Sequence, residues 1–99
     1  MSLSLVLAAI IAVESGGRNV VSRTGDVGPA QMSPAAIMED GTPERRLARL
    51  ARELPQHGMP VNIYTMALAW RAPTRAYRGR PTDADVRYAE RVRRIYLCP

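Results

Sequence analysis

The 99-residue chain has the length and composition of one small folded domain, spanning residues 1–99. Its 46% hydrophobic content excludes an intrinsically disordered protein. The formal net charge is +5, and every one of its strongly basic residues is arginine, so the surface favours anionic partners such as nucleic acid, anionic lipid or carboxylate-bearing peptides. Because Cys98 and His57 are single residues of their types, an internal disulfide and a Cys/His metal site are both excluded.

The first predicted element is an apolar helix from Leu3 to Val13, which carries Glu14 at its end and stops at Gly16 and Gly17. The run is too short to span a bilayer. No arginine precedes it and no small-x-small cleavage site follows it, so we interpret it as a buried helix rather than a signal peptide. We therefore expect the chain to lack its own export signal.

The segment from Arg18 to Gln31 is rich in glycine, valine, threonine and serine. Val20–Ser22 and Val27, separated by Thr24–Asp26, predict a small β-hairpin with a glycine turn.

Four further helices are predicted, each from a recognisable start. Ser33–Pro34 and Thr42–Pro43 each place an N-cap residue before a proline at the first helical position. Pro60 opens a strongly apolar helix that reaches Trp70, and Thr82–Asp85 forms a capping box for the last helix. The expected fold class is mainly α, with about five helices and a small β-hairpin between the first two.

Two short motifs stand out in the first third of the chain. One is Glu14-Ser15-Gly16, and the other is Gly28-Pro29-Ala30-Gln31-Met32-Ser33-Pro34. Together they resemble the signature of the soluble lytic transglycosylase family of the lysozyme-like superfamily, which reads E-S-G and then G-x-x-Q-hydrophobic-x-P. The resemblance implies a lysozyme-like helical domain that cleaves the MurNAc-GlcNAc β-1,4 bond of peptidoglycan glycan strands, with no cofactor and no metal.

Glu14 is the catalytic candidate. Cleavage of a glycosidic bond needs a proton for the leaving oxygen, and burial beside apolar groups raises the pKa of a carboxyl group so that it can hold that proton. The resemblance implies that Glu14 acts first as acid and then as base, while the substrate's own N-acetyl group assists. The product is 1,6-anhydro-MurNAc, and no second carboxylate is required.

The resemblance also supplies candidate substrate-binding residues around Glu14. Gln31 is expected to point its amide at sugar hydroxyl or acetamido groups, and Met32 to pack beneath Glu14 and desolvate it. Ser15 is expected to act as an internal hydrogen-bonding residue of the site rather than as a catalytic one.

The family's later motifs are present in altered form. Trp70 stands where relatives carry tyrosine, which keeps an aromatic surface for a sugar, while Arg71 replaces an asparagine and Pro73 a glycine. Tyr88 and Val92 retain the aromatic and the valine of the last-helix motif. The resemblance thus adds Trp70, Arg71 and Tyr88 to the candidate substrate-binding residues, and Asp26 is a further candidate.

Asp26 leaves the type of reaction open. On a hairpin tip opposite Glu14 it could activate water, which would make the protein a hydrolytic muramidase. We favour the alternative interpretation, in which Asp26 belongs to a simple Thr-Gly-Asp turn.

Two non-enzymatic alternatives remain. One is a nucleic-acid-binding module, based on two arginine stripes at helical spacing: Arg45, Arg46, Arg49 and Arg52, and Arg87, Arg91 and Arg94. Interspersed glutamates and the lack of a nucleic-acid-binding motif disfavour it. The other is a catalytically weak wall-binding module. For the enzyme we expect action in the periplasm or cell wall, reached through a phage particle, a phage lysis system or a secretion apparatus.

Overall fold

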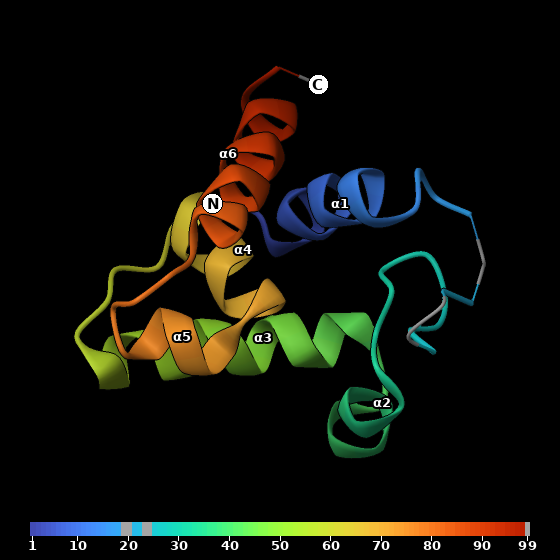
Figure 1. Ribbon diagram of the computed structural model, residues 1–99, viewed down its shortest axis with the longest axis horizontal. Coiled ribbons are helices and arrows are strands. Elements are labelled where there is room, and N and C mark those ends of the chain that lie inside the picture. The colour runs from blue at the N-terminus through green and yellow to red at the C-terminus, as the bar shows by residue number, and fades with distance from the viewer. Residues whose placement is uncertain (19–20, 23–24, 99) are drawn as a thin grey trace.

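The protein is mainly helical in the residues that its computed structural model describes, which are 1–18, 21–22 and 25–98 (Figure 1). This confirms the mainly α class that the sequence predicts. The elements in chain order are α1 (Leu3–Glu14), α2 (Pro34–Asp40), α3 (Pro43–Glu53), the 3₁₀ helix η1 (Leu54–His57), α4 (Ile63–Arg71), α5 (Pro73–Tyr77) and α6 (Asp83–Leu97). Among the described residues, no helix is both long and apolar enough to cross a membrane.

Three helices begin where their capping residues predict. The side chains of Ser33, Thr42 and Thr82 each accept a hydrogen bond from the backbone N–H three residues further on, at 3.1, 3.2 and 3.1 Å. The fourth helix begins later than predicted, at Ile63 rather than at Pro60, because Asn62 and Thr65 form a reciprocal capping box.

The centre of the fold is α4, which lies against α3, α5 and α6 (Figure 1). All residues from Thr65 to Trp70 are buried, so this part of α4 presents no solvent-facing side. Helices α1 and α6 also pack together, and α1 contacts α3. Fully buried side chains from these helices and from η1 lie in the core: Val6, Ile10, Leu47, Leu50, Leu54, Met66 and Val92.

One short helix, α5, was not predicted from the sequence. Pro73 ends α4 because its ring cannot continue the helix, and it then takes the first position of α5. The ring of Tyr77 at the end of α5 stacks on His57 of η1, with centroids 4.0 Å apart and planes 3° from parallel. The pair joins two short elements that are distant in sequence.

The prediction of a β-hairpin between the first two helices is wrong, because the described residues contain no pair of strands there. Val20 and Thr24 of that prediction lie outside the described residues, and the described part contains isolated antiparallel bridges that join Val27 to Val21 and to Met32. The physical reason is the spacing of turns. Gly25 and Gly28 have φ angles of 82° and 81°, and the two residues between them are too few for a ladder.

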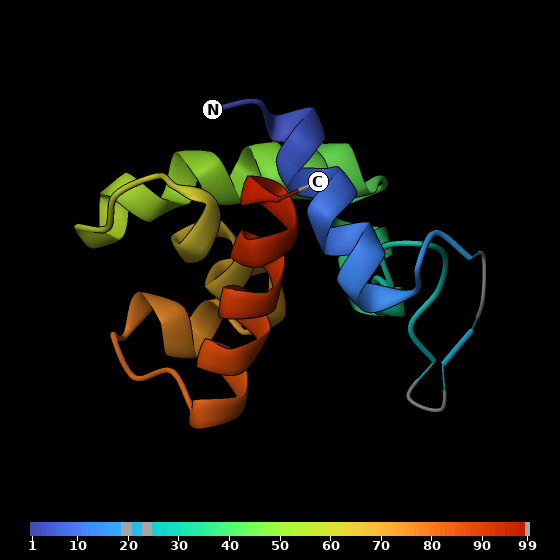
Figure 2. The ribbon, with the colours of Figure 1, turned by 90° about the horizontal axis from the view of Figure 1, so that it is seen from above.

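The segment that joins α1 to α2 lies at one side of the helical body (Figures 1 and 2). Val27 and Met32 exchange two backbone hydrogen bonds of 2.8 and 3.0 Å around the turn at 28–31. Met32 is only 2% exposed and belongs to the core, so it anchors this segment to the helices.

Candidate active site

Glu14 ends α1 inside a pocket of about 280 Å³. The helix stops there because Gly16 and Gly17 adopt φ angles of 67° and 90°, which leaves no following helical turn to cover the carboxyl group. The pocket is lined by Glu14 of α1, by Asp26, Gln31 and Ser33 of the connecting segment, by Arg46 of α3, and by Trp70 and Arg71 of α4.

Burial raises the pKa of the Glu14 carboxyl above its ordinary value, and the negative charge of Asp26 adds to the rise. A contact with the Tyr88 hydroxyl and the positive charges of Arg71 and Arg46 act in the opposite direction. The carboxyl group is therefore placed to hold a proton at a higher pH than a solvated glutamate does.

Ser15 is an internal hydrogen-bonding residue, as expected. Its hydroxyl donates to the carbonyl of Pro29 at 2.5 Å and accepts from the backbone N–H of Gly17 at 3.1 Å. It does not line the pocket. Its role is to tie the end of α1 to the turn that carries Gln31, which sets the two pocket walls relative to each other.

Gln31 lines the pocket, but part of its amide is committed to its own turn. The backbone N–H and the side-chain Nε2 of Gln31 both donate to the carbonyl of Gly28, at 3.0 and 2.8 Å. Its φ angle is 51°, a left-handed conformation that costs free energy for a residue with a Cβ atom. The position of Gln31 is therefore maintained against backbone strain.

This strain leads to a stability prediction. Both Gln31→Ala and Gln31→Gly remove the side-chain hydrogen bond, but only glycine relieves the left-handed backbone. We expect Gln31→Gly to be more stable than Gln31→Ala by about 1 kcal/mol, measured by urea denaturation. Equal stability of the two variants would contradict a strained backbone at this position.

Tyr88 and Met32 do not line the pocket, and both side chains belong to the buried core. Tyr88 of α6 is 5% exposed, and its hydroxyl has no partner at good hydrogen-bonding geometry in the described part of the chain. Burial and then the nearby Glu14 charge raise the pKa of the Tyr88 phenol. The Tyr88 hydroxyl is nevertheless near enough to Glu14 to lower the pKa of that carboxyl group.

Trp70 does not provide the open sugar-stacking surface that was expected. It is 3% exposed, and the guanidinium group of Arg46 lies over its ring, 4.3 Å from the centroid. Arg46 also donates from Nη2 to the Trp70 carbonyl at 2.8 Å. Because the Trp70 ring is otherwise buried in the core, it offers little surface to a sugar. It supports instead an arginine that faces the pocket.

Arg71 is held at the pocket by Asp85. Its Nε donates to Oδ1 of Asp85 at 2.8 Å, and its guanidinium group lies 5.4 Å from the centroid of the Tyr88 ring. The Asp85 side chain is 1% exposed and also binds Arg75 and the backbone N–H of Thr82. The Arg75 and Arg71 contacts and the Thr82 bonds hold the pKa of Asp85 well below its usual range, against the effect of its burial.

Asp26 lines the pocket and also takes part in a turn. Its backbone N–H donates to the Ser22 hydroxyl at 3.1 Å, and its carbonyl accepts from the Ser22 N–H at 2.9 Å. Its charge also contributes to the raised pKa of Glu14. The two interpretations made from the sequence are thus compatible, since the turn brings the carboxylate to the site.

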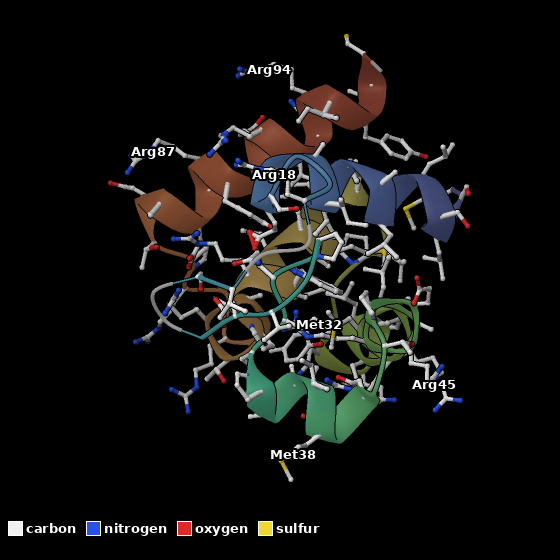
Figure 3. All side chains as sticks on the ribbon, turned by 90° about the vertical axis from the view of Figure 1, so that its right-hand side faces the viewer. Arg18, Met32, Met38, Arg45, Arg87 and Arg94 are labelled. Atoms are coloured by element: carbon white, nitrogen blue, oxygen red, sulfur yellow. The ribbon has the colours of Figure 1, made fainter. Side chains whose placement is uncertain are left out.

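The arginines of α3 do not form one continuous face. Arg46 faces the pocket, Arg49 pairs with Asp40 and Glu53, and Arg45 points away from the molecule (Figure 3). Arg87 and Arg94 project outward from α6 (Figure 3). The arginines of α3 are therefore paired or divergent, which makes this helix a poor track for phosphates.

Three site residues were missed by reasoning from the sequence: Ser33, Arg46 and Asp85. Arg46 precedes the buried Leu50 by four residues, so helical spacing does indicate that it borders the apolar face. For Asp85 the capping box was recognised, but its ion pairs with Arg71 and Arg75 depend on how α6 packs against α4 and α5.

The described residues contain no cluster of three or more histidine, cysteine or acidic side chains that could hold a metal ion. Comparison of the chain with models of known families, with characterised proteins and with solved structures yields no match.

Proposed function

We propose that this protein is a peptidoglycan lytic transglycosylase with a lysozyme-like fold, in which Glu14 is the single catalytic carboxyl group. The observation that carries the proposal is the placement of Glu14 at the end of α1, in a pocket that also contains Gln31, with burial raising the pKa of the carboxyl group. The resemblance of the two sequence motifs to that family supports it.

In the proposed reaction, the Glu14 carboxyl group donates its proton to the glycosidic oxygen between MurNAc and GlcNAc. As the C1–O bond breaks, the N-acetyl oxygen of MurNAc bonds to C1, and GlcNAc leaves with a free 4-hydroxyl. The ionised Glu14 then takes the proton of the MurNAc 6-hydroxyl, whose oxygen bonds to C1 and displaces the N-acetyl oxygen. The product is 1,6-anhydro-MurNAc, and Glu14 regains its proton.

A hydrolytic muramidase is the second candidate, because Asp26 lines the same pocket as Glu14. In that reaction Asp26 would activate a water molecule or stabilise the glycosyl intermediate. The product would then be a reducing end that contains one more water than the anhydro end.

The mass of the released muropeptides distinguishes these reactions. We expect the wild-type protein to release fragments that end in 1,6-anhydro-MurNAc, and Asp26→Asn to retain nearly full activity, because the proposed reaction uses one carboxyl group. Mass spectrometry of digested peptidoglycan measures both. Reducing ends from the wild type, together with a large loss of activity in Asp26→Asn, would establish the muramidase instead.

We place the activity in the periplasm or cell wall, where its substrate lies. A phage particle, a phage lysis system or a secretion apparatus is the proposed route, with phage origin preferred.

A further inference from the structure

Within residues 1–18, 21–22 and 25–98, Arg46 is a partly buried cation that forms no hydrogen bond to a carboxylate. Its contacts are the Trp70 carbonyl, at 2.8 Å from Nη2, and the Trp70 ring beneath its guanidinium group. Its Nε atom is buried and has no partner in the described part of the chain. By contrast, Arg49, one turn further along α3, binds both Asp40 and Glu53.

This arrangement is unfavourable for the fold alone. Removing a guanidinium group from water costs free energy unless an anion or several acceptors replace the water. Desolvation lowers the pKa of Arg46, and the negative charges of Asp40 and Glu39 compensate only from a distance. A ligand anion would supply the missing partner.

A second guanidinium group lines the same pocket. Arg71 is fixed by Asp85 through Nε and by its position over the Tyr88 ring, while its side chain remains 38% exposed. Arg46 and Arg71 thus approach the pocket from α3 and α4, and an aromatic ring supports each of them. Guanidinium groups that are fixed in this way suit a planar, bidentate anion.

We propose that Arg46 and Arg71 form a subsite for a carboxylate of the glycan strand, beside the bond that Glu14 cleaves. This inference rests on the proposed function. Two sources share the chemistry: the lactyl carboxylate of MurNAc without its peptide, and the carboxylates of the stem peptide. A carboxylate suits the pocket better than a phosphate, because Asp26 on the same pocket wall would repel a doubly charged group more strongly.

Occupation of this subsite would also affect the catalytic group. The charges of Arg71 and Arg46 both lower the pKa of Glu14 in the empty pocket. A bound carboxylate offsets these charges, so a charged substrate should help Glu14 to keep its proton. We therefore expect the alkaline limb of the pH–rate profile to lie at higher pH for charged strands than for the same strands with amidated carboxylates.

The test measures binding without turnover, in the Glu14→Gln protein. One pair of ligands is a MurNAc-GlcNAc tetrasaccharide with free lactyl carboxylates and the same molecule as its methylamide. A second pair carries stem peptides with free or amidated carboxylates. Calorimetry should show about tenfold to hundredfold tighter binding of the free acid in at least one pair, and that pair identifies the source.

Arg46→Gln in the same background should remove this preference, whereas Arg45→Gln should keep it. Arg45 is the neighbouring residue of α3, is exposed and points away from the molecule (Figure 3), so it is a matched charge control. Since the ligand pairs are compared on one protein, the main result does not depend on whether an arginine variant folds.

Equal affinity for acid and amide in both pairs, or a preference that survives Arg46→Gln, overturns the subsite. If the wild type still releases anhydro-muropeptides, the proposed function stands without the carboxylate subsite. If the protein neither cleaves peptidoglycan nor binds any of these glycans, both proposals fail.

Discussion

Glu14→Gln should reduce the release of fragments from purified peptidoglycan by about 10²- to 10⁴-fold. Glutamine keeps the size and hydrogen-bonding capacity of the side chain but cannot deliver a proton to the leaving oxygen. The measurement is the initial rate of muropeptide release, with Glu44→Gln as control. Glu44 is exposed in the first turn of α3, so its replacement removes an equal charge outside the pocket and should leave the rate unchanged.

The same variant should be more stable relative to wild type at pH 7 than at pH 3. The folded pKa of Glu14 is raised above its unfolded value of about 4.3. Ionised Glu14 therefore destabilises the folded protein. This free-energy cost is absent at low pH and develops as the pH rises through the folded pKa. Glutamine never incurs it. Full activity in Glu14→Gln would refute the catalytic assignment, and a pH-independent stability difference would contradict the raised pKa.

Of the proposed variants, Asp85→Ala should lose the most stability. The free energy of unfolding should fall by about 2–3 kcal/mol, which lowers the melting temperature by roughly 10–20 °C in a protein of this size. The change removes the capping-box partner of Thr82 and the carboxylate that holds Arg71 and Arg75. Activity should fall as well, because Arg71 loses the contact that positions it. Thermal unfolding monitored by circular dichroism measures the first effect.

Asp83→Asn is the matched control, because Asp83 lies in the same first turn of α6 but is exposed. We expect it to change stability by less than about 0.5 kcal/mol. The pKa of Asp85 is lowered in the fold, mainly by Arg75, so its stabilising contribution is present above its unfolded pKa of about 3.9 and is lost as the pH falls below it. An Asp85→Ala protein as stable as wild type at pH 7 would exclude this network as a stabilising element.

Much of the fold could be predicted because its signals are local. Ser33, Thr42 and Thr82 predicted three helix starts because an N-cap side chain bonds to a backbone N–H three residues away. The spacing of Leu47 and Leu50 predicted the buried side of α3, because residues three or four positions apart lie on one face of a helix. The predicted hairpin failed because Val27 lies between Gly25 and Gly28, which both have positive φ angles, so only isolated bridges form among the described residues.

The sequence alone determined the helical class, most helix starts and the position of Glu14 at the end of an apolar helix, because each depends on residues within about one turn of each other. Only the tertiary structure decided how deeply that carboxyl group is buried and which arginines and ion pairs lie around it. Arg46 lies over Trp70, and Asp85 holds Arg71, across 24 and 14 residues of sequence. Such contacts depend on how α3, α4 and α6 pack. The same packing buries Glu14 and Arg46, and this burial raises the pKa of Glu14 and makes the lack of an anionic partner costly for Arg46.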